Sequence, residues 1–257
     1  MFFPISDDDR AINRPVYITQ VLLLINVLVF AYQVSNPEFT YGWSVIPREI
    51  TTGEDLVGMI LLEVPDREPI QLPQAPGPTP IYLTLLTSMF MHSGTGHIVG
   101  NMLYLWIFGD NVEHRFGPMR FLIFYVSAGL AASIAQIMLD PNGLVPTLGA
   151  SGAIAGVMGA YMVLFPRNRV NAVFLFSIVS VPAIVVLGMW ILTQFVSGYG
   201  SIMQSAGQVG GVAYAAHIGG FITGVCGGLV ARTRMPDEPD SILKRNYDRD
   251  PRARRIW

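Results

Sequence analysis

The sequence predicts an all-α membrane protein, a bundle of six transmembrane helices with a long first extracytoplasmic loop. Two observations lead to this fold class. Of the 257 residues, 51% are hydrophobic and only 13% are charged, whereas a typical soluble domain carries about 25% charged residues. Charged residues are also absent from five long stretches, the longest of which runs from Arg169 to Arg232. About 20 apolar residues cross the hydrocarbon core of a bilayer, so the longest stretch has room for two spans and each of the others for one.

Each span is placed inside a stretch without charges. The expected spans are residues 16–33, 96–109, 120–139, 149–165, 170–195 and 215–231. The second and the last are short, and their glycine-rich flanks could continue the helix. Between the first two spans, residues 34–95 form the main irregular region, which is rich in proline. Its apolar run, residues 81–91, is too short to span and is expected at the interface or packed on the bundle.

The basic residues predict the orientation in the membrane. Six spans place both termini on one side, and all of the 16 Lys and Arg residues except Arg48 and Arg67 then lie on that side. Cytoplasmic loops collect Lys and Arg. Residues 1–15 are therefore expected to form a cytoplasmic segment and residues 16–231 the membrane domain. Residues 232–257 are expected to form a polar, disordered cytoplasmic tail.

Composition also limits the partners and the compartment. The net charge of −2 gives no reason to expect a nucleic-acid partner, and the single Cys226 excludes an intramolecular disulfide. Acidic residues at positions 7–9 do not suit a signal peptide. Nothing resembles an organelle transit peptide, so a prokaryotic plasma membrane is expected. The lipid bilayer is the expected surrounding, and the oligomeric state is left open.

Polar residues inside spans are costly and point to function. Three polar clusters occupy residues 92–101, 149–152 and 216–220, at the starts of the second, fourth and sixth expected spans. These three spans enter from the same face, and a rise of about 1.5 Å per residue puts their first turns at one depth. His97 and Asn101 are four residues apart and share a helix face. They are therefore expected to converge with Ser151 and His217.

Small residues support the pairing of the fourth and sixth spans. They recur every four residues at Gly152, Gly156 and Ala160, and at Gly220, Gly224 and Gly228. Such stripes let helix backbones approach closely in lipid. If the two stripes pack together, Ser151 and His217 lie near each other, and activation of a serine by a histidine requires that closeness.

With these motifs in order, the chain resembles the rhomboid family of intramembrane serine proteases. Gly-Ala-Ser-Gly around Ser151, Ala-His at His217 and His-x-x-x-Asn ending at Asn101 match the three motifs of that family. A Glu-x-Arg motif, expected in a loop, follows the second span. The resemblance covers about residues 82–231, plus a plausible first span.

The resemblance implies a Ser151–His217 dyad that cleaves other transmembrane proteins in or near their membrane segments. It also implies an oxyanion hole made by Asn101, His97 and the backbone N–H of Ser151. The flanking Gly149 and Gly152 would let that N–H face the substrate. No metal or cofactor is expected.

Two departures from the family motifs and three alternative functions remain, of which a transporter is the least favoured, because no paired interrupted helices in two related halves are found. Family members often carry an aromatic residue four positions after the nucleophile, where this chain has Ala155, and Trp43 is followed by Ser44 rather than arginine. The absence of an aromatic side chain at Ala155 favours a catalytically inactive relative that binds transmembrane helices. The retained dyad argues against it. A metalloprotease would want His-Glu-x-x-His, which is absent.

Overall fold

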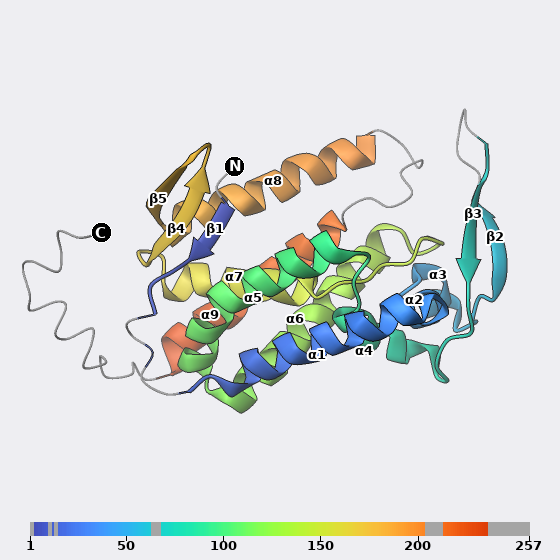
Figure 1. Ribbon diagram of the computed structural model, residues 1–257, viewed down its shortest axis with the longest axis horizontal. Helices are drawn as coiled ribbons and strands as arrows, with labels where there is room; N and C mark the ends of the chain where they lie inside the picture. Colours follow the sequence, from blue (N-terminus) through green and yellow to red (C-terminus); the bar gives the residue numbers. More distant parts are fainter. Residues whose placement is uncertain (1–2, 10–11, 13–14, 63–67, 204–212, 236–257) are drawn as a thin grey trace, which may run out of the picture.

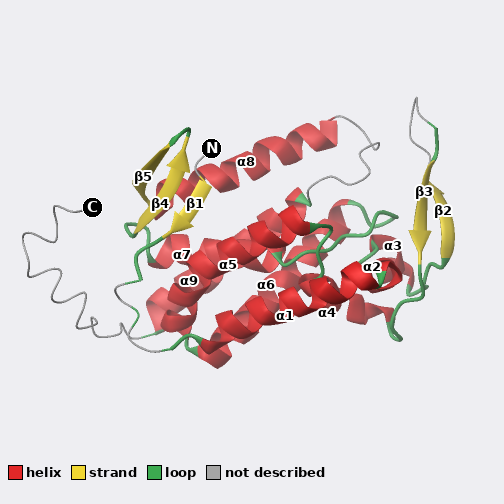
Figure 2. Ribbon diagram, viewed as in Figure 1, coloured by secondary structure: helices red, strands yellow, loops and turns green. Residues whose placement is uncertain are grey.

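The computed structural model describes residues 3–9, 12, 15–62, 68–203 and 213–235. Within them, six helices of 14 to 22 residues form a bundle (Figures 1 and 2). They are α1 (Tyr17–Ser35), α5 (Thr95–Phe116), α6 (Pro118–Leu139), α7 (Ser151–Leu164), α8 (Ala183–Met203) and α9 (Tyr214–Arg234). By length and composition, α1, α6 and α9 could each cross a membrane. Most of the expected tail, residues 236–257, lies outside the described residues.

The expected fifth span is wrong in its first half. The structure has a hairpin there, β4 (Arg169–Phe174) and β5 (Ser177–Pro182), and α8 begins only at Ala183. An apolar run alone cannot distinguish a buried helix from a strand, and this one is rich in β-branched residues, which favour strands. The N-terminal strand β1 (Phe3–Ser6) pairs with β4, so the sheet order is β1-β4-β5.

The first loop is more ordered than expected. It contains the helices α2 (Pro37–Trp43) and α3 (Pro47–Thr52), the hairpin of β2 (Gly58–Leu62) and β3 (Ile70–Gln74), and three short turns, η1 (Ile81–Leu83), α4 (Thr84–Thr87) and η2 (Ser88–Phe90). Proline at the first position of α2 and of α3 suits a helix start, because its fixed φ is already helical. Buried Ile81, Met89 and Met91 pack the expected apolar run on the bundle.

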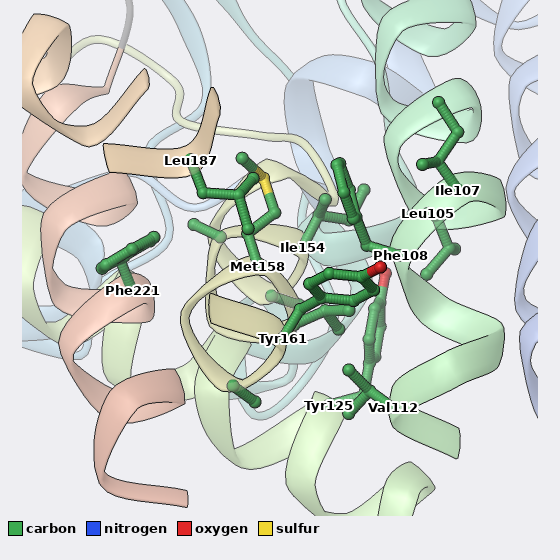
Figure 3. Close-up of a cluster of buried hydrophobic side chains, with 14 of the residues drawn as sticks. Leu105, Ile107, Phe108, Val112, Tyr125, Ile154, Met158, Tyr161, Leu187 and Phe221 are labelled. Atoms are coloured by element: carbon green, nitrogen blue, oxygen red, sulfur yellow. The ribbon is translucent and has the colours of Figure 1, made fainter. Parts of the chain in front are cut away.

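Helix α7 is the centre of the bundle. All of residues 152–161 are buried, and Figure 3 shows Ile154, Met158 and Tyr161 of α7 among side chains from α5, α6, α8 and α9. The outer helices carry exposed large apolar side chains such as Leu28, Ile123, Leu192 and Ile222. Exposed apolar side chains of this kind are typical of helices that face lipid. The same outer helices cover α7.

The glycine stripes of α7 and α9 pack together, as their spacing predicted. A Cβ on Gly220 would overlap the carbonyl oxygen of Gly152, and a Cβ on Gly224 would overlap that of Gly156. Backbone therefore lies directly on backbone where the two helices cross. Because α5, α7 and α9 all begin at the end of the bundle that carries β2 and β3 (Figure 1), their first turns meet there.

The Glu-x-Arg motif lies in the last turn of α5, since α5 runs on past the expected end at Gly109 to Phe116. The buried Glu113 carboxylate accepts the backbone N–H groups of Ile18 (2.9 Å) and Thr19 (2.7 Å). It thereby caps the start of α1. Arg115 donates to the Met235 carbonyl oxygen (3.1 Å) beyond the end of α9. One turn of α5 thus holds the ends of two other helices.

Candidate active site

The structure brings Ser151 and His217 into hydrogen-bonding contact. Ser151 is the first residue of α7, and His217 lies in the first turn of α9. The distance from Ser151 Oγ to His217 Nε2 is 2.8 Å. His217 is only 9% exposed. The pair therefore has the geometry of a hydroxyl nucleophile and its general base.

The start of α7 provides a backbone donor at Ser151 that has no partner within the helix. Gly149 has a φ of +131°, a conformation that glycine adopts readily, and its own N–H donates to the Ser88 carbonyl oxygen (2.9 Å). The first N–H groups of a helix have no partner within the helix. The Ser151 N–H is such a group. Gly152 instead serves packing, because a Cβ there would lie 2.5 Å from the Cβ of Ala132 on α6.

His97 and Ser151 both lie beside the position that a side chain on Gly149 would occupy. A Cβ placed on Gly149 would lie 2.9 Å from His97 Nε2 and 3.6 Å from Ser151 Oγ. His97 Nδ1 is 3.3 Å from the backbone nitrogen of Ser93, which can only donate, so Nδ1 is the acceptor. In a neutral imidazole the other nitrogen then carries the hydrogen. His97 therefore presents an N–H donor toward the space around Ser151.

Asn101 supplies a second side-chain donor on α5. The residue is 7% exposed, one turn after His97. Its Nδ2 is buried and has no hydrogen-bond partner among the described residues. An unpaired buried amide is uncommon in folded proteins and calls for an explanation. A substrate oxygen that binds in the site would give Asn101 Nδ2 a hydrogen-bond partner.

His92 packs against His97 and links this region to α1. Its ring lies edge-on to His97, with a centroid distance of 5.1 Å, and its backbone N–H donates to Gln33 Oε1 of α1 (2.9 Å). A cavity of about 520 Å³ adjoins it between α1, α2 and the loops that precede α5 and α7. A smaller cavity of about 20 Å³ touches Ser151 and Ser133, which is room for one water.

Two residues of α8 that the sequence analysis did not single out also contact His217. Gln194 Oε1 is 2.7 Å from His217 Nδ1. The Trp190 ring lies 5.6 Å from the imidazole between centroids, with an interplanar angle of 38°. Ala155 is fully buried in α7 and offers no ring. The sequence did contain a signal for Gln194, since it is a polar residue inside an apolar stretch, and such a side chain usually has a partner.

Comparison with known proteins agrees with this arrangement. The rhomboid domain model matches residues 80–234. The rhomboid protease GluP of Bacillus subtilis is 35% identical over 149 residues, which cover 56% of this chain and 26% of GluP. The mitochondrial rhomboid protein 1 of Saccharomyces cerevisiae is 31% identical over 147 residues, 56% of this chain and 40% of that protein.

The aligned part of the chain thus spans less than half the length of these relatives. They are bacterial and mitochondrial, so the comparison does not support the expected prokaryotic plasma membrane over an organelle membrane. The matched domain covers more than half of this chain and includes both the glycine-packed helices and the Ser151–His217 contact. The chain is a membrane protein of the rhomboid family.

Proposed function

We propose that this chain is an intramembrane serine endopeptidase with Ser151 as nucleophile and His217 as general base. The observation that carries the proposal is the 2.8 Å contact between Ser151 Oγ and His217 Nε2 at the start of two closely packed helices. Ser151 Oγ attacks the scissile carbonyl carbon while Nε2 takes the hydroxyl proton. The imidazolium then returns that proton to the departing amine. Water hydrolyses the acyl-enzyme, with His217 again acting as base.

Three donors would stabilise the oxyanion of each tetrahedral intermediate. They are the backbone N–H of Ser151, the Nε2–H of His97 and the Nδ2 of Asn101, which has no partner among the described residues. Donors that already point at the developing charge, in a site poor in water, need no reorganisation during the reaction. Gly149 keeps the space between His97 and Ser151 free of a side chain.

The proposed substrates are transmembrane proteins, cut in or near their membrane segments. The outer helices present apolar side chains to lipid, so a substrate helix can reach the site from the bilayer. We also propose that both chain termini are cytoplasmic, from the distribution of basic residues. The site at the starts of α5, α7 and α9 would then lie toward the extracytoplasmic face.

One observation favours a second candidate, a catalytically inactive relative that binds transmembrane helices. The position that often carries an aromatic residue is the buried Ala155, and a poorly oriented His217 would not activate Ser151. The two candidates differ in one measurable property, because only an enzyme has an activated serine.

The test is labelling of the purified chain in detergent with a fluorophosphonate, together with cleavage of a transmembrane reporter. Wild-type protein should be labelled at Ser151 and should cleave. Ser151→Ala should abolish both signals and His217→Ala should strongly reduce them. Ser127→Ala is the control, because Ser127 is an exposed serine of α6. Reporter binding without labelling or cleavage would identify the inactive relative.

A further inference from the structure

We propose that Gln194 of α8 is a positioning residue, which holds His217 in the tautomer that a general base requires. This inference rests on the proposed function. A neutral imidazole carries one N–H, and a base must turn the unprotonated nitrogen toward the serine hydroxyl. For His217 that nitrogen is Nε2, which lies 2.8 Å from Ser151 Oγ. The hydrogen must therefore reside on Nδ1 and needs an acceptor.

Gln194 is that acceptor. Its Oε1 lies 2.7 Å from His217 Nδ1, and Gln194 is only 8% exposed. In enzymes with a catalytic triad a carboxylate occupies this position. No carboxylate of the described residues contacts the His217 ring. A neutral amide oxygen can select the same tautomer without placing a charge in the bundle, where an unpaired charge is expensive.

The orientation of the Gln194 amide is itself determined by its neighbours. Its Nε2 donates to Thr193 Oγ1 (3.2 Å) and to the Trp190 carbonyl oxygen (3.4 Å). The Thr193 hydroxyl donates its own hydrogen to that same carbonyl (2.6 Å), so toward the Gln194 amide it acts as an acceptor. If the Gln194 amide were flipped, its oxygen would face two acceptors, the Thr193 hydroxyl and the Trp190 carbonyl. Its N–H groups would then face His217 Nδ1. That flip would favour the tautomer in which His217 cannot act as base.

Trp190 completes the support from the same helix. Its ring packs against His217 and, with a centroid distance of 6.2 Å, against Phe221 one turn further along α9. Ala155 of α7 has no ring with which to stack on the imidazole. Both the ring plane and the tautomer of His217 are thus set by α8. The missing aromatic residue on α7 does not leave the base unsupported.

The experiment compares three substitutions in the chain of residues 1–257. Gln194→Met keeps the side-chain length and removes the acceptor, whereas Gln194→Glu keeps an acceptor oxygen. Gln136→Met is the matched control: Gln136 Oε1 accepts from the backbone nitrogen of Ala216, the neighbour of His217, at 3.3 Å. Turnover of the transmembrane reporter, fluorophosphonate labelling rate and Tm are measured on each preparation.

Gln194→Met should lower kcat by about 10- to 100-fold and leave KM nearly unchanged, because a buried N–H loses its acceptor and the tautomer is no longer selected. Gln194→Glu should recover most of that loss. Gln136→Met should keep the wild-type kcat. A purely structural role for Gln194 would lower Tm and leave kcat per folded molecule unchanged, and that result would overturn the proposal.

Two further outcomes separate this proposal from the proposed function. If Ser151→Ala is inactive and Gln194→Met turns over like wild type, the positioning role is wrong and the dyad stands. If wild-type Ser151 is neither labelled nor active, the proposed function itself fails. Should Gln194→Met not fold, Thr193→Val tests the same point, because it frees the amide to flip. We expect kcat to fall about 2- to 5-fold, and an unchanged kcat would overturn the proposal.

Discussion

Gly220→Ala should separate α7 from α9 and damage both stability and catalysis. A Cβ on Gly220 would overlap the Gly152 carbonyl oxygen and lie 2.9 Å from the carbonyl carbon. Since a carbon and an oxygen need about 3.3 Å, the helices must move apart by about 1 Å. Overpacking of this kind costs about 1–3 kcal/mol, and the better helix propensity of alanine offsets about 0.5–1 kcal/mol.

The net loss, at most about 2.5 kcal/mol, corresponds to a fall in Tm of up to about 10 °C for a chain of this size. The catalytic effect should be larger. Gly152 follows Ser151 directly, so the same movement lengthens the 2.8 Å contact between Ser151 and His217. A misplacement of about 1 Å can lower the rate about 100-fold. We therefore expect kcat to fall by that order at temperatures well below the melting transition.

Gly188→Ala is the matched control for this substitution. Gly188 also lies inside a long helix, α8, but a Cβ there would meet nothing within 4 Å. It should keep wild-type activity, with a Tm that is unchanged or raised by up to about 4 °C. Thermal unfolding in detergent and reporter cleavage on the same samples measure both effects. A Gly220→Ala protein that melts and cleaves like wild type would refute close backbone packing of α7 on α9.

Three other predictions concern the oxyanion hole, the N-terminal segment and the orientation. Asn101→Ala should lower kcat about 100- to 1,000-fold with little change in KM; early melting with normal turnover per folded molecule would instead assign Asn101 a structural role. Burial, with the nearby Asp9 carboxylate, raises the pKa of Asp7 to about 9. The folded state thus favours the protonated Asp7 carboxyl. Its contribution to the free energy of unfolding is complete below about pH 4 and is lost as pH rises through about 9. Tm should fall across that range, and Asp7→Asn should flatten the slope; an equally steep slope in the variant would contradict the assignment to Asp7. In a cysteine-free background, an impermeant thiol reagent applied to intact cells should label Asn142→Cys and spare Asn168→Cys, and the reverse pattern would invert the topology.

The polar site was largely predictable because its signals are short-range patterns. His97 and Asn101 share a helix face through their spacing of four, and the parity of the spans places Ser151 and His217 at the same end. The glycine spacing predicted which two helices pack together. The structure agrees with each of these placements. The chemical roles of the residues stay proposals until the variants are assayed.

Other features depended on contacts that no local pattern encodes. Residues 170–182 continue the apolar stretch of α8, yet they form the β4–β5 hairpin, and the strand that joins this hairpin, β1, comes from residues 3–6. Glu113 lies in a helix and caps α1, 94 residues away in the sequence from the Thr19 that it binds. The position of Gln194 was visible as a polar residue in an apolar stretch, but its partner was not.

What the sequence determined by itself is the membrane class, the approximate positions of most long helices and the set of residues that could form a site. Each follows from the length of apolar runs, the placement of charge and the spacing of motifs along one helix. Only the tertiary structure decided that α8 contacts His217 through Gln194 and Trp190. That contact depends on the rotation and crossing of α8 against α9. Helix periodicity says which residues share a face, but packing alone determines which neighbouring helix that face meets.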